Sequence, residues 1–159
     1  MKIQIRQAVE DDMLSVLNLI KQLAIYEKEP NAVEVTLTDL KWDGFGENPA
    51  FTCFVAEVDN NIAGIALVYP RYSTWKGRAL HLEDLIVDEN MRGKGIGSLL
   101  LNEVVKYGHD LGVKRIGWEV LDWNESAIGF YKQKGANILR EWDVVQLDEH
   151  AIKTYLSKL

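Results

Sequence analysis

The sequence predicts a mixed α/β fold in which a central, twisted, mostly antiparallel sheet carries helices on both faces. The chain has 159 residues, which fits a single domain over 1–159, and strand-like and helix-like periodicities follow one another as β-α-α-β-β-β-α-β-α-β. Apolar residues make up 47% and charged residues 26%, which is enough apolar side chain for a packed core. No repeat, low-complexity tract or long linker interrupts this order.

The first elements are a strand and two helices. Residues 2–6 alternate polar and apolar, as a half-buried strand does. Two aspartates then precede apolar side chains at three- and four-residue spacing, which predicts an amphipathic helix ending near Tyr26. Thr36 or Thr38 is placed to cap a short second helix that runs toward Trp42.

Three strands are expected in the middle of the chain. The β-prone runs Phe51–Val58 and Ile62–Tyr69 are joined by the turn residues Asp59-Asn60-Asn61, which predicts a hairpin. A further strand is expected at Ala79–Val87. The three prolines fall between periodic segments, where turns belong.

The last third should begin with a glycine-rich turn and a helix from Ser98 to near Asp110. The inward stripe of this helix is expected to be Leu99, Leu100, Val104, Tyr107 and Leu111. The remaining elements expected are a strand at Lys114–Leu121, a helix at Asn124–Lys134 and one or two final strands within Asn137–Leu147.

Composition excludes several classes of protein. A net charge of −6 argues against binding to nucleic-acid phosphates, and no apolar run is long enough to span a bilayer. Cys53 is the single cysteine, so no disulfide framework or cysteine-based zinc site is expected, and the three histidines lack metal-ligand spacing. We therefore expect a cytoplasmic protein with no bound metal, nucleic-acid partner or membrane partner.

The turn Arg92-Gly93-Lys94-Gly95-Ile96-Gly97 is suited to binding an anion, because glycines allow close backbone approach at the start of a helix. A Walker A loop requires Ser or Thr after Gly-Lys, but Gly95 stands there. A Rossmann fingerprint would need glycine at position 100, which is leucine. On spacing alone, a tight turn without a ligand remains an alternative.

Arg92-x-x-Gly95-x-Gly97, preceded by the run Leu82–Val87, resembles the acetyl-CoA signature of the GCN5-related N-acetyltransferases. The resemblance implies that loop amides hold the pyrophosphate of acetyl-CoA and that the preceding strand pairs with the pantetheine arm. The cofactor contacts it implies are Leu85, Ile86, Val87, Arg92, Gly93, Lys94, Gly95, Ile96, Gly97, Ser98, Asn124 and Tyr131.

Four longer stretches are similar to the spermidine/spermine (diamine) and thialysine N-acetyltransferase subfamily: Leu19–Glu27, Asp43–Pro49, Trp75–Asp84 and Trp123–Ala136. This resemblance implies acetyl transfer to a primary amine of a small cationic substrate, by direct attack in a ternary complex, and a homodimer. The alternatives are an amino-acid or peptide N-acetyltransferase and a CoA-binding module without catalysis.

The resemblance places Tyr131 at the general-acid position and Glu83 at the position of a base acting through water. Without the resemblance, Tyr131 would be interpreted as packing beside Phe130. Glu83 and Asp84 are adjacent on an apolar strand, so strict alternation points them to opposite faces. The structural alternative is that one of them forms a salt bridge to Arg78 or Arg92.

Substrate contacts are expected from Tyr26, Glu27, Asp84, Glu141 and Trp142, in a cleft with several carboxylates and aromatic walls. The spacing at Glu141-Trp142 departs from the subfamily pattern by an apparent deletion, which weakens that part of the assignment. His81 alternates with Glu83 on the same strand and could join the site, although a structural histidine with its hydrogen bonds satisfied is the simpler interpretation.

Overall fold

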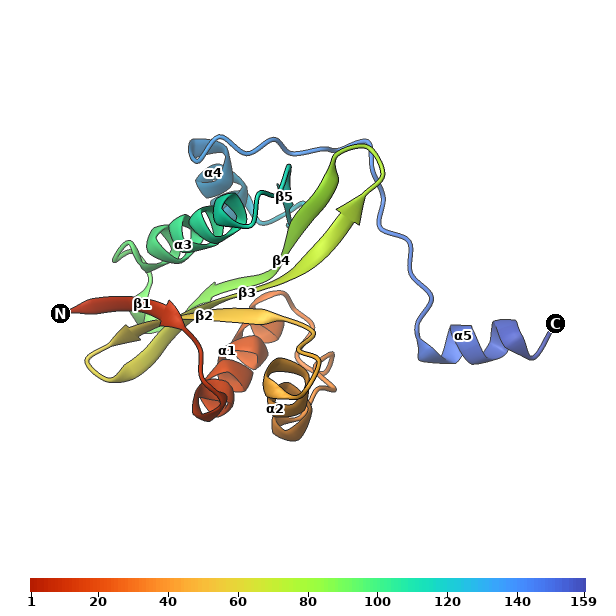
Figure 1. Ribbon diagram of the computed structural model, residues 1–159, viewed down its shortest axis with the longest axis horizontal. Helices are drawn as coiled ribbons and strands as arrows, with labels where there is room; N and C mark the ends of the chain where they lie inside the picture. Colours follow the sequence, from red (N-terminus) through yellow and green to blue (C-terminus); the bar gives the residue numbers. More distant parts are fainter. The chain divides into compact units, whose positions relative to one another are not determined.

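The computed structural model describes all residues, 1–159, and the chain divides into two compact units, Met1–Glu119 and Val120–Leu159. Each unit is described by itself (Figure 1). The first unit contains the sheet and three α-helices, and the second contains two α-helices.

The sheet has five strands in the order β1-β2-β3-β4-β5. Their bounds are β1 Ile3–Gln7, β2 Thr52–Val58, β3 Asn61–Ser73, β4 Gly77–Val87 and β5 Ile116–Gly117. The first four strands pair antiparallel in sequence order, and β5 pairs parallel to β4. The mixed, mostly antiparallel sheet expected from the sequence is confirmed.

Helices cover both faces of this sheet. α1 (Met13–Tyr26) and α2 (Leu37–Phe45) lie on one face and α3 (Ile96–Asp110) lies on the other (Figure 1). The period of β3 fits this arrangement, because Ile65 and Leu67 join the α1 core, whereas Gly64, one residue before Ile65, lies against Leu100 of α3. Two short 3-10 turns, Glu10–Asp12 and Glu89–Met91, precede α1 and α3.

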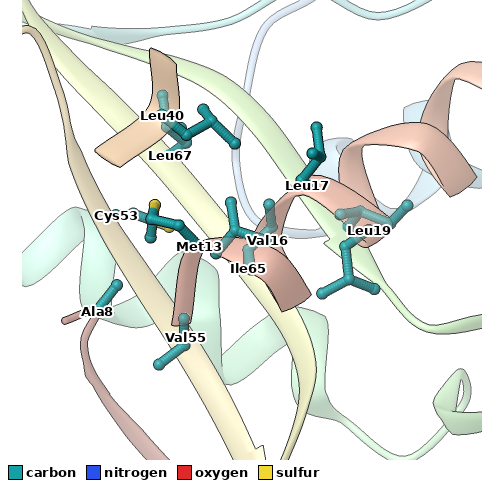
Figure 2. Close-up of a cluster of buried hydrophobic side chains, with 11 residues drawn as sticks. Ala8, Met13, Val16, Leu17, Leu19, Leu40, Cys53, Val55, Ile65 and Leu67 are labelled. Carbon is teal, nitrogen blue, oxygen red and sulfur yellow. The ribbon is translucent and has the colours of Figure 1, made fainter. Parts of the chain in front are cut away.

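The core between α1, α2 and the sheet is closely packed. Figure 2 shows its side chains, among them the fully buried Met13, Val16, Val55 and Ile65. Burying one such side chain contributes ~1.5–3 kcal/mol, so this cluster anchors α1 on the sheet. Thr36, rather than Thr38, caps α2: its Oγ1 accepts from Asp39 N at 3.1 Å, and Asp39 accepts from Thr36 N at 2.8 Å.

In the second unit, α4 (Glu125–Gln133) and α5 (Glu149–Leu156) are each capped by the side chain before their first residue. Asn124 Oδ1 accepts from Ala127 N at 3.2 Å, and Asp148 Oδ1 accepts from Ala151 N at 2.7 Å. Residues 134–148, between the two helices, contain no helix or strand.

The prediction of one or two final strands within 137–147 is wrong, and α5 was not predicted. Alternation of apolar residues is necessary for a half-buried strand, but a strand also requires a neighbour that accepts its backbone hydrogen bonds. Most of the large apolar side chains of this segment remain exposed: Leu139, Trp142, Val144, Val145 and Leu147. The strand expected at 114–121 is likewise reduced to Ile116–Gly117.

The inward stripe of α3 was only partly predicted. The helix begins at Ile96, two residues earlier than expected, and buries residues at four-residue spacing. These buried residues are Ile96, Leu100, Leu101, Val104 and Gly108. Leu99 and Leu111 are exposed, and Tyr107 is half-buried against Phe54, with ring centroids 5.2 Å apart.

Pro70 lies inside β3 and not in a turn. It is tolerated there because β2 stops pairing with β3 at Val68, so the proline needs no amide hydrogen on that side. β3 and β4 therefore continue as a two-stranded hairpin as far as Ser73 and Gly77. No helix in the structure has both the length and the apolar character needed to cross a membrane.

Candidate active site

The centre of the candidate site is an irregularity in β4. Leu67 of β3 pairs with Asp84 and Val68 pairs with Leu82, so Glu83 is an extra residue without a partner on β3. An inserted residue of this kind is a β-bulge, which re-aims the side chains that follow it. The alternation of side chains along the sequence gives no sign of this bulge. The bulge changes which side chains of β4 share a face of the sheet.

The bulge puts His81 and Asp84 on the same face of the sheet. His81 is opposite Tyr69 and Asp84 is opposite Leu67, and residues 67 and 69 share a face because they alternate along β3. The Glu83 carboxylate contacts both Tyr69 and His81. The expectation that Glu83 and Asp84 point to opposite faces is therefore wrong, because it assumed strict alternation through a bulge.

Glu83 is held by two side chains. The Tyr69 hydroxyl donates to Glu83 Oε2 at 2.9 Å, and His81 Nε2 lies 3.4 Å from the same oxygen. The rings of Tyr69 and His81 have centroids 5.0 Å apart. Burial, followed by the hydrogen bond and charge of Glu83, raises the pKa of Tyr69 to about 12. Tyr69 was not predicted from the sequence, because only the hairpin register shows that it faces Glu83.

Neither Glu83 nor Asp84 forms a salt bridge to an arginine. The alternative that one of them pairs with Arg78 or Arg92 for structural reasons is therefore not observed. The side chain of His81 is 9% exposed, and its Nδ1 is buried without a hydrogen-bond partner. The interpretation of His81 as a fully satisfied structural histidine is therefore wrong. The imidazole belongs to the Glu83 cluster.

Three carboxylates interact electrostatically in the first unit. Burial raises the pKa of Asp84 to about 6, with further contributions from the negative charges of Glu83 and Glu27. Burial also raises the pKa of Glu27, which caps the C-terminus of α1. The sequence-based expectation that Glu27, Glu83 and Asp84 approach one another is consistent with this coupling. A cation would relieve the repulsion among them.

On the side away from β3, most of β4 has no partner strand. β5 pairs with β4 only at Leu80 and His81, and the bulged Glu83 follows within two residues. No strand pairs with Leu85–Val87 on that edge, and apart from Val87 O, which accepts from Arg92 Nε at 3.2 Å, their outward backbone groups can pair with an extended ligand. An amide-containing arm such as pantetheine has the required donors and acceptors.

The glycine-rich loop leads from this edge to α3. Gly93 and Gly95 have φ of +75° and +82°, and a Cβ atom at either position would meet nothing within 4 Å. No side chain caps α3, whose N-cap is Gly95, and this leaves the first amides of a 15-residue helix available. A diphosphate fits such a cradle of free amides.

Two contacts tie α1 to this loop. Gln22 Nε2 donates to Asp88 Oδ2 at 3.1 Å, and the Arg92 guanidinium lies 4.9 Å from the centroid of the Tyr26 ring. Arg92 Nε also donates to Val87 O at 3.2 Å. The end of α1 that carries Tyr26 and Glu27 is thereby joined to the loop expected to hold the cofactor. Gln22 was not predicted as part of the site.

The second unit carries the remaining candidates. Tyr131 is a buried residue of α4 with its ring centroid 5.4 Å from that of Phe130, and Asn124 is the N-cap of the same helix. Glu141 and Trp142 lie in the segment without helix or strand, and both are exposed. That Asn124 and Tyr131 contact acetyl-CoA and that Glu141 and Trp142 contact the substrate stays a prediction.

Comparisons with known proteins agree with this geometry. Residues 15–136 match the Acetyltransferase (GNAT) family. The chain is 38% identical to a thialysine N-epsilon-acetyltransferase of Bos taurus, over 98% of both chains. It is 36% identical to the spermidine/spermine N(1)-acetyltransferase-like protein 1 of Homo sapiens, over 84% of this chain and 20% of that protein.

A solved integron cassette protein from the V. cholerae mobile metagenome has the same fold, with a TM-score of 0.80 and 22% identity over 98% of both chains. The family match covers more than half of the chain, and the bovine relative aligns over nearly all of it. The chain belongs to the acetyltransferase (GNAT) family and is an N-acetyltransferase.

Proposed function

We propose that this enzyme transfers the acetyl group of acetyl-CoA to a primary amine of a small cationic substrate, such as a diamine, a polyamine or a lysine-like amine of the thialysine type. The observation that carries the proposal is the coupled set of Glu27, Glu83 and Asp84. Three neighbouring carboxylates without an arginine partner favour a ligand that brings its own positive charges. The names of the bovine and human relatives support the same substrate class.

In this proposal the two units form one catalytic domain over 1–159, and the family match supports this because it runs across the boundary at residue 119. The amides of the loop Arg92–Ser98 would hold the diphosphate of acetyl-CoA, and the open edge at Leu85–Val87 would pair with its pantetheine arm. Asn124 and Tyr131 would complete the contacts from α4. Bound there, acetyl-CoA supplies the acetyl group as a thioester.

Glu83 and Tyr131 carry out the proton transfers of the proposed reaction. Glu83, through a water molecule, removes a proton from the substrate ammonium, so that the neutral nitrogen can attack the thioester carbonyl carbon. As the carbon–sulfur bond breaks, Tyr131 donates its phenolic proton to the departing thiolate, and the proton that the attacking nitrogen loses to become the amide returns to the Tyr131 phenolate. An ordinary phenol, with a pKa of ~10, is a suitable donor to a thiolate. Glu27 and Asp84 would bind the second cation, flanked by Tyr26, Glu141 and Trp142.

A panel of amines tests the substrate class. Thiol release from acetyl-CoA would be measured with diamines, polyamines, thialysine, lysine, a peptide with a free N-terminus and a singly charged aromatic amine. We expect the highest kcat/KM with a dication. A higher kcat/KM for the aromatic amine or the peptide than for every diamine and lysine analogue would contradict the substrate class, and release with none of them would favour a CoA-binding module.

We expect Glu27→Gln to raise KM for the preferred dication by ~5-fold and to leave kcat nearly unchanged, because Glu27 would bind the remote ammonium equally in ground and transition states. Added salt should weaken amine binding in the native enzyme more than in this variant. Glu29→Gln, an exposed change two residues further on, is the matched control and should leave KM native. An equal loss in kcat from Glu27→Gln would contradict a binding role.

Gly95→Val should lower acetyl-CoA affinity by ~10-fold or more, since a branched side chain would project into the diphosphate cradle. It also places a branched residue at φ +82°, which costs ~1–2 kcal/mol of stability. Gly112→Val is the matched control, because Gly112 has φ +70°, follows the other end of α3 and has equally open surroundings. Calorimetry showing the same loss of affinity in both variants, or in neither, would exclude a cradle at Gly95.

The proposal includes a homodimer. Support comes from the exposed apolar side chains of residues 137–147, which a second copy would shield from water. Light scattering at micromolar concentration should give twice the chain mass of 18.1 kDa. A mass equal to that of one chain would contradict the dimer.

A further inference from the structure

Two side chains converge on one oxygen of Glu83. We infer that Tyr69 and His81 are positioning residues that hold Glu83 Oε2, so that Oε1 is the oxygen that receives the substrate proton. The inference rests on the proposed role of Glu83 as the base. It concerns residues whose place in the site follows from the hairpin register of β3 and β4.

Glu83 needs support from side chains because of its backbone position. As the extra residue of the bulge it has no partner on β3, and its side chain is 50% exposed. A half-exposed carboxylate on an irregular stretch of strand would otherwise sample several rotamers. A base that acts through a single water requires one of its oxygens to be fixed in direction.

Tyr69 supplies the stronger of the two contacts. Its hydroxyl donates to Oε2 at 2.9 Å, a normal hydrogen-bond length, and its pKa of about 12 keeps the phenol protonated at any working pH. The charged groups that face this phenol are Glu83 and Glu119, which favour the protonated form, and Arg71, which opposes it. Tyr69 is therefore a permanent donor, and Oε2 is a permanent acceptor.

His81 supplies the second contact, and its surroundings select one tautomer. Its Nε2 lies 3.4 Å from Oε2, and its buried Nδ1 has no partner. A hydrogen on Nδ1 would be a buried donor without an acceptor, and it would turn the lone pair of Nε2 toward a carboxylate. A hydrogen on Nε2 points at Oε2 and leaves only an unpaired acceptor at Nδ1, which is the less costly arrangement.

With both donors on Oε2, the lone pairs of Oε1 are left for a water molecule at this half-exposed carboxylate. The ammonium proton passes through water to Oε1, and from there it can leave to solvent. Asp84 and Glu27 contribute negative charge to this region, but they have no donor to offer the carboxylate. Tyr69 and His81 therefore set the direction of Glu83, and its two acidic neighbours bind the cation.

The first test reads the tautomer directly and does not depend on activity. Long-range ¹H–¹⁵N NMR of the full chain at about pH 9, where an ordinary imidazole is neutral, should show the hydrogen of His81 on Nε2. Glu83→Gln should change the Nε2 chemical shift. A hydrogen on Nδ1, or an unchanged spectrum in Glu83→Gln, would overturn the inference.

The second test is a double-mutant cycle on kcat. Tyr69→Phe keeps the ring and should lower kcat by roughly 10-fold, with KM for both substrates nearly native, because misdirecting a base impairs proton transfer and not binding. In a Glu83→Gln background the same change should have no further effect. A similar loss in both backgrounds would assign Tyr69 a purely structural role and overturn the inference.

His81 is tested by a conservative pair of variants. His81→Leu should lower kcat by a smaller factor than Tyr69→Phe, in line with its longer contact, and His81→Gln should restore activity because its amide nitrogen can stand where Nε2 does. Equal activity of the two variants would overturn the role of His81. A native kcat in Glu83→Gln itself would instead refute the proposed base, and the inference would fall with it.

Discussion

Tyr131→Phe is expected to lower kcat by ~100-fold or more while acetyl-CoA affinity and stability stay close to native, because general acid–base catalysis contributes ~100- to 10,000-fold to a rate. The substitution keeps the buried ring and its packing beside Phe130 on α4. It removes the phenolic hydroxyl, and with it the proton that the departing thiolate would take. The decisive measurement is kcat at saturating amine and acetyl-CoA, accompanied by an unfolding curve.

Tyr155→Phe provides the control, since Tyr155 is an exposed residue of α5 in the same unit. Its kcat should be native. If the leaving thiolate depends on the acid, the defect of Tyr131→Phe should shrink with an acyl donor whose thiol is more acidic. A near-native kcat in Tyr131→Phe would reduce Tyr131 to a packing residue and would require another acid.

Local signals in the sequence predicted most of the elements. These signals act over a few residues: α1 begins directly after the two aspartates, Thr36 caps α2, and the turn at Asp59-Asn60 joins β2 to β3. Segments whose structure depends on a distant partner were predicted less well. Residues 137–147 alternate like a strand, but they have no neighbour to accept their hydrogen bonds, so the pattern alone was insufficient.

In the candidate site, too, features with a local sequence signal could be predicted, and features that depend on a distant partner could not. The glycine loop could be predicted because positive-φ glycines before a helix have a short sequence signature, and the structure places Gly93 and Gly95 in that conformation. The bulge at Glu83 could not be predicted, because an inserted residue is visible only in the register between β3 and β4. Tyr69 was missed for that reason, and the contact between His81 and Glu83 was considered only as an alternative.

Asp84→Asn is expected to increase the free energy of unfolding by about 1–3 kcal/mol at pH 8, an unusual gain for a change in a candidate site. The pKa of Asp84 is raised from 3.8 to about 6 in the folded state, mainly by burial and then by the charges of Glu83 and Glu27. A tenfold change in proton affinity corresponds to ~1.4 kcal/mol, and partial exposure of the side chain reduces the full amount.

The sign of the pH dependence follows from linkage. Because the folded state binds the Asp84 proton more tightly than the unfolded state does, the stabilisation from that proton is fully present below the unfolded pKa of 3.8 and is lost as the pH rises through about 6. The native protein should therefore lose this contribution between about pH 4 and pH 7. The Asn variant has no charge to bury, so its advantage should be largest above pH 7 and should disappear near pH 4.

Urea unfolding of the two proteins across this range measures the difference directly, with Asp43→Asn as the control because Asp43 is exposed on α2. That control should show no comparable pH-dependent gain. Asp84→Asn should stabilise the fold but weaken substrate binding, so in the amine assay we expect it to raise KM for a dication. The carboxylate that destabilises the empty site would be the one that binds the substrate. A variant that is less stable than the native protein at pH 8 would show that Asp84 is stabilised by a partner, and it would remove the electrostatic support for a cationic substrate.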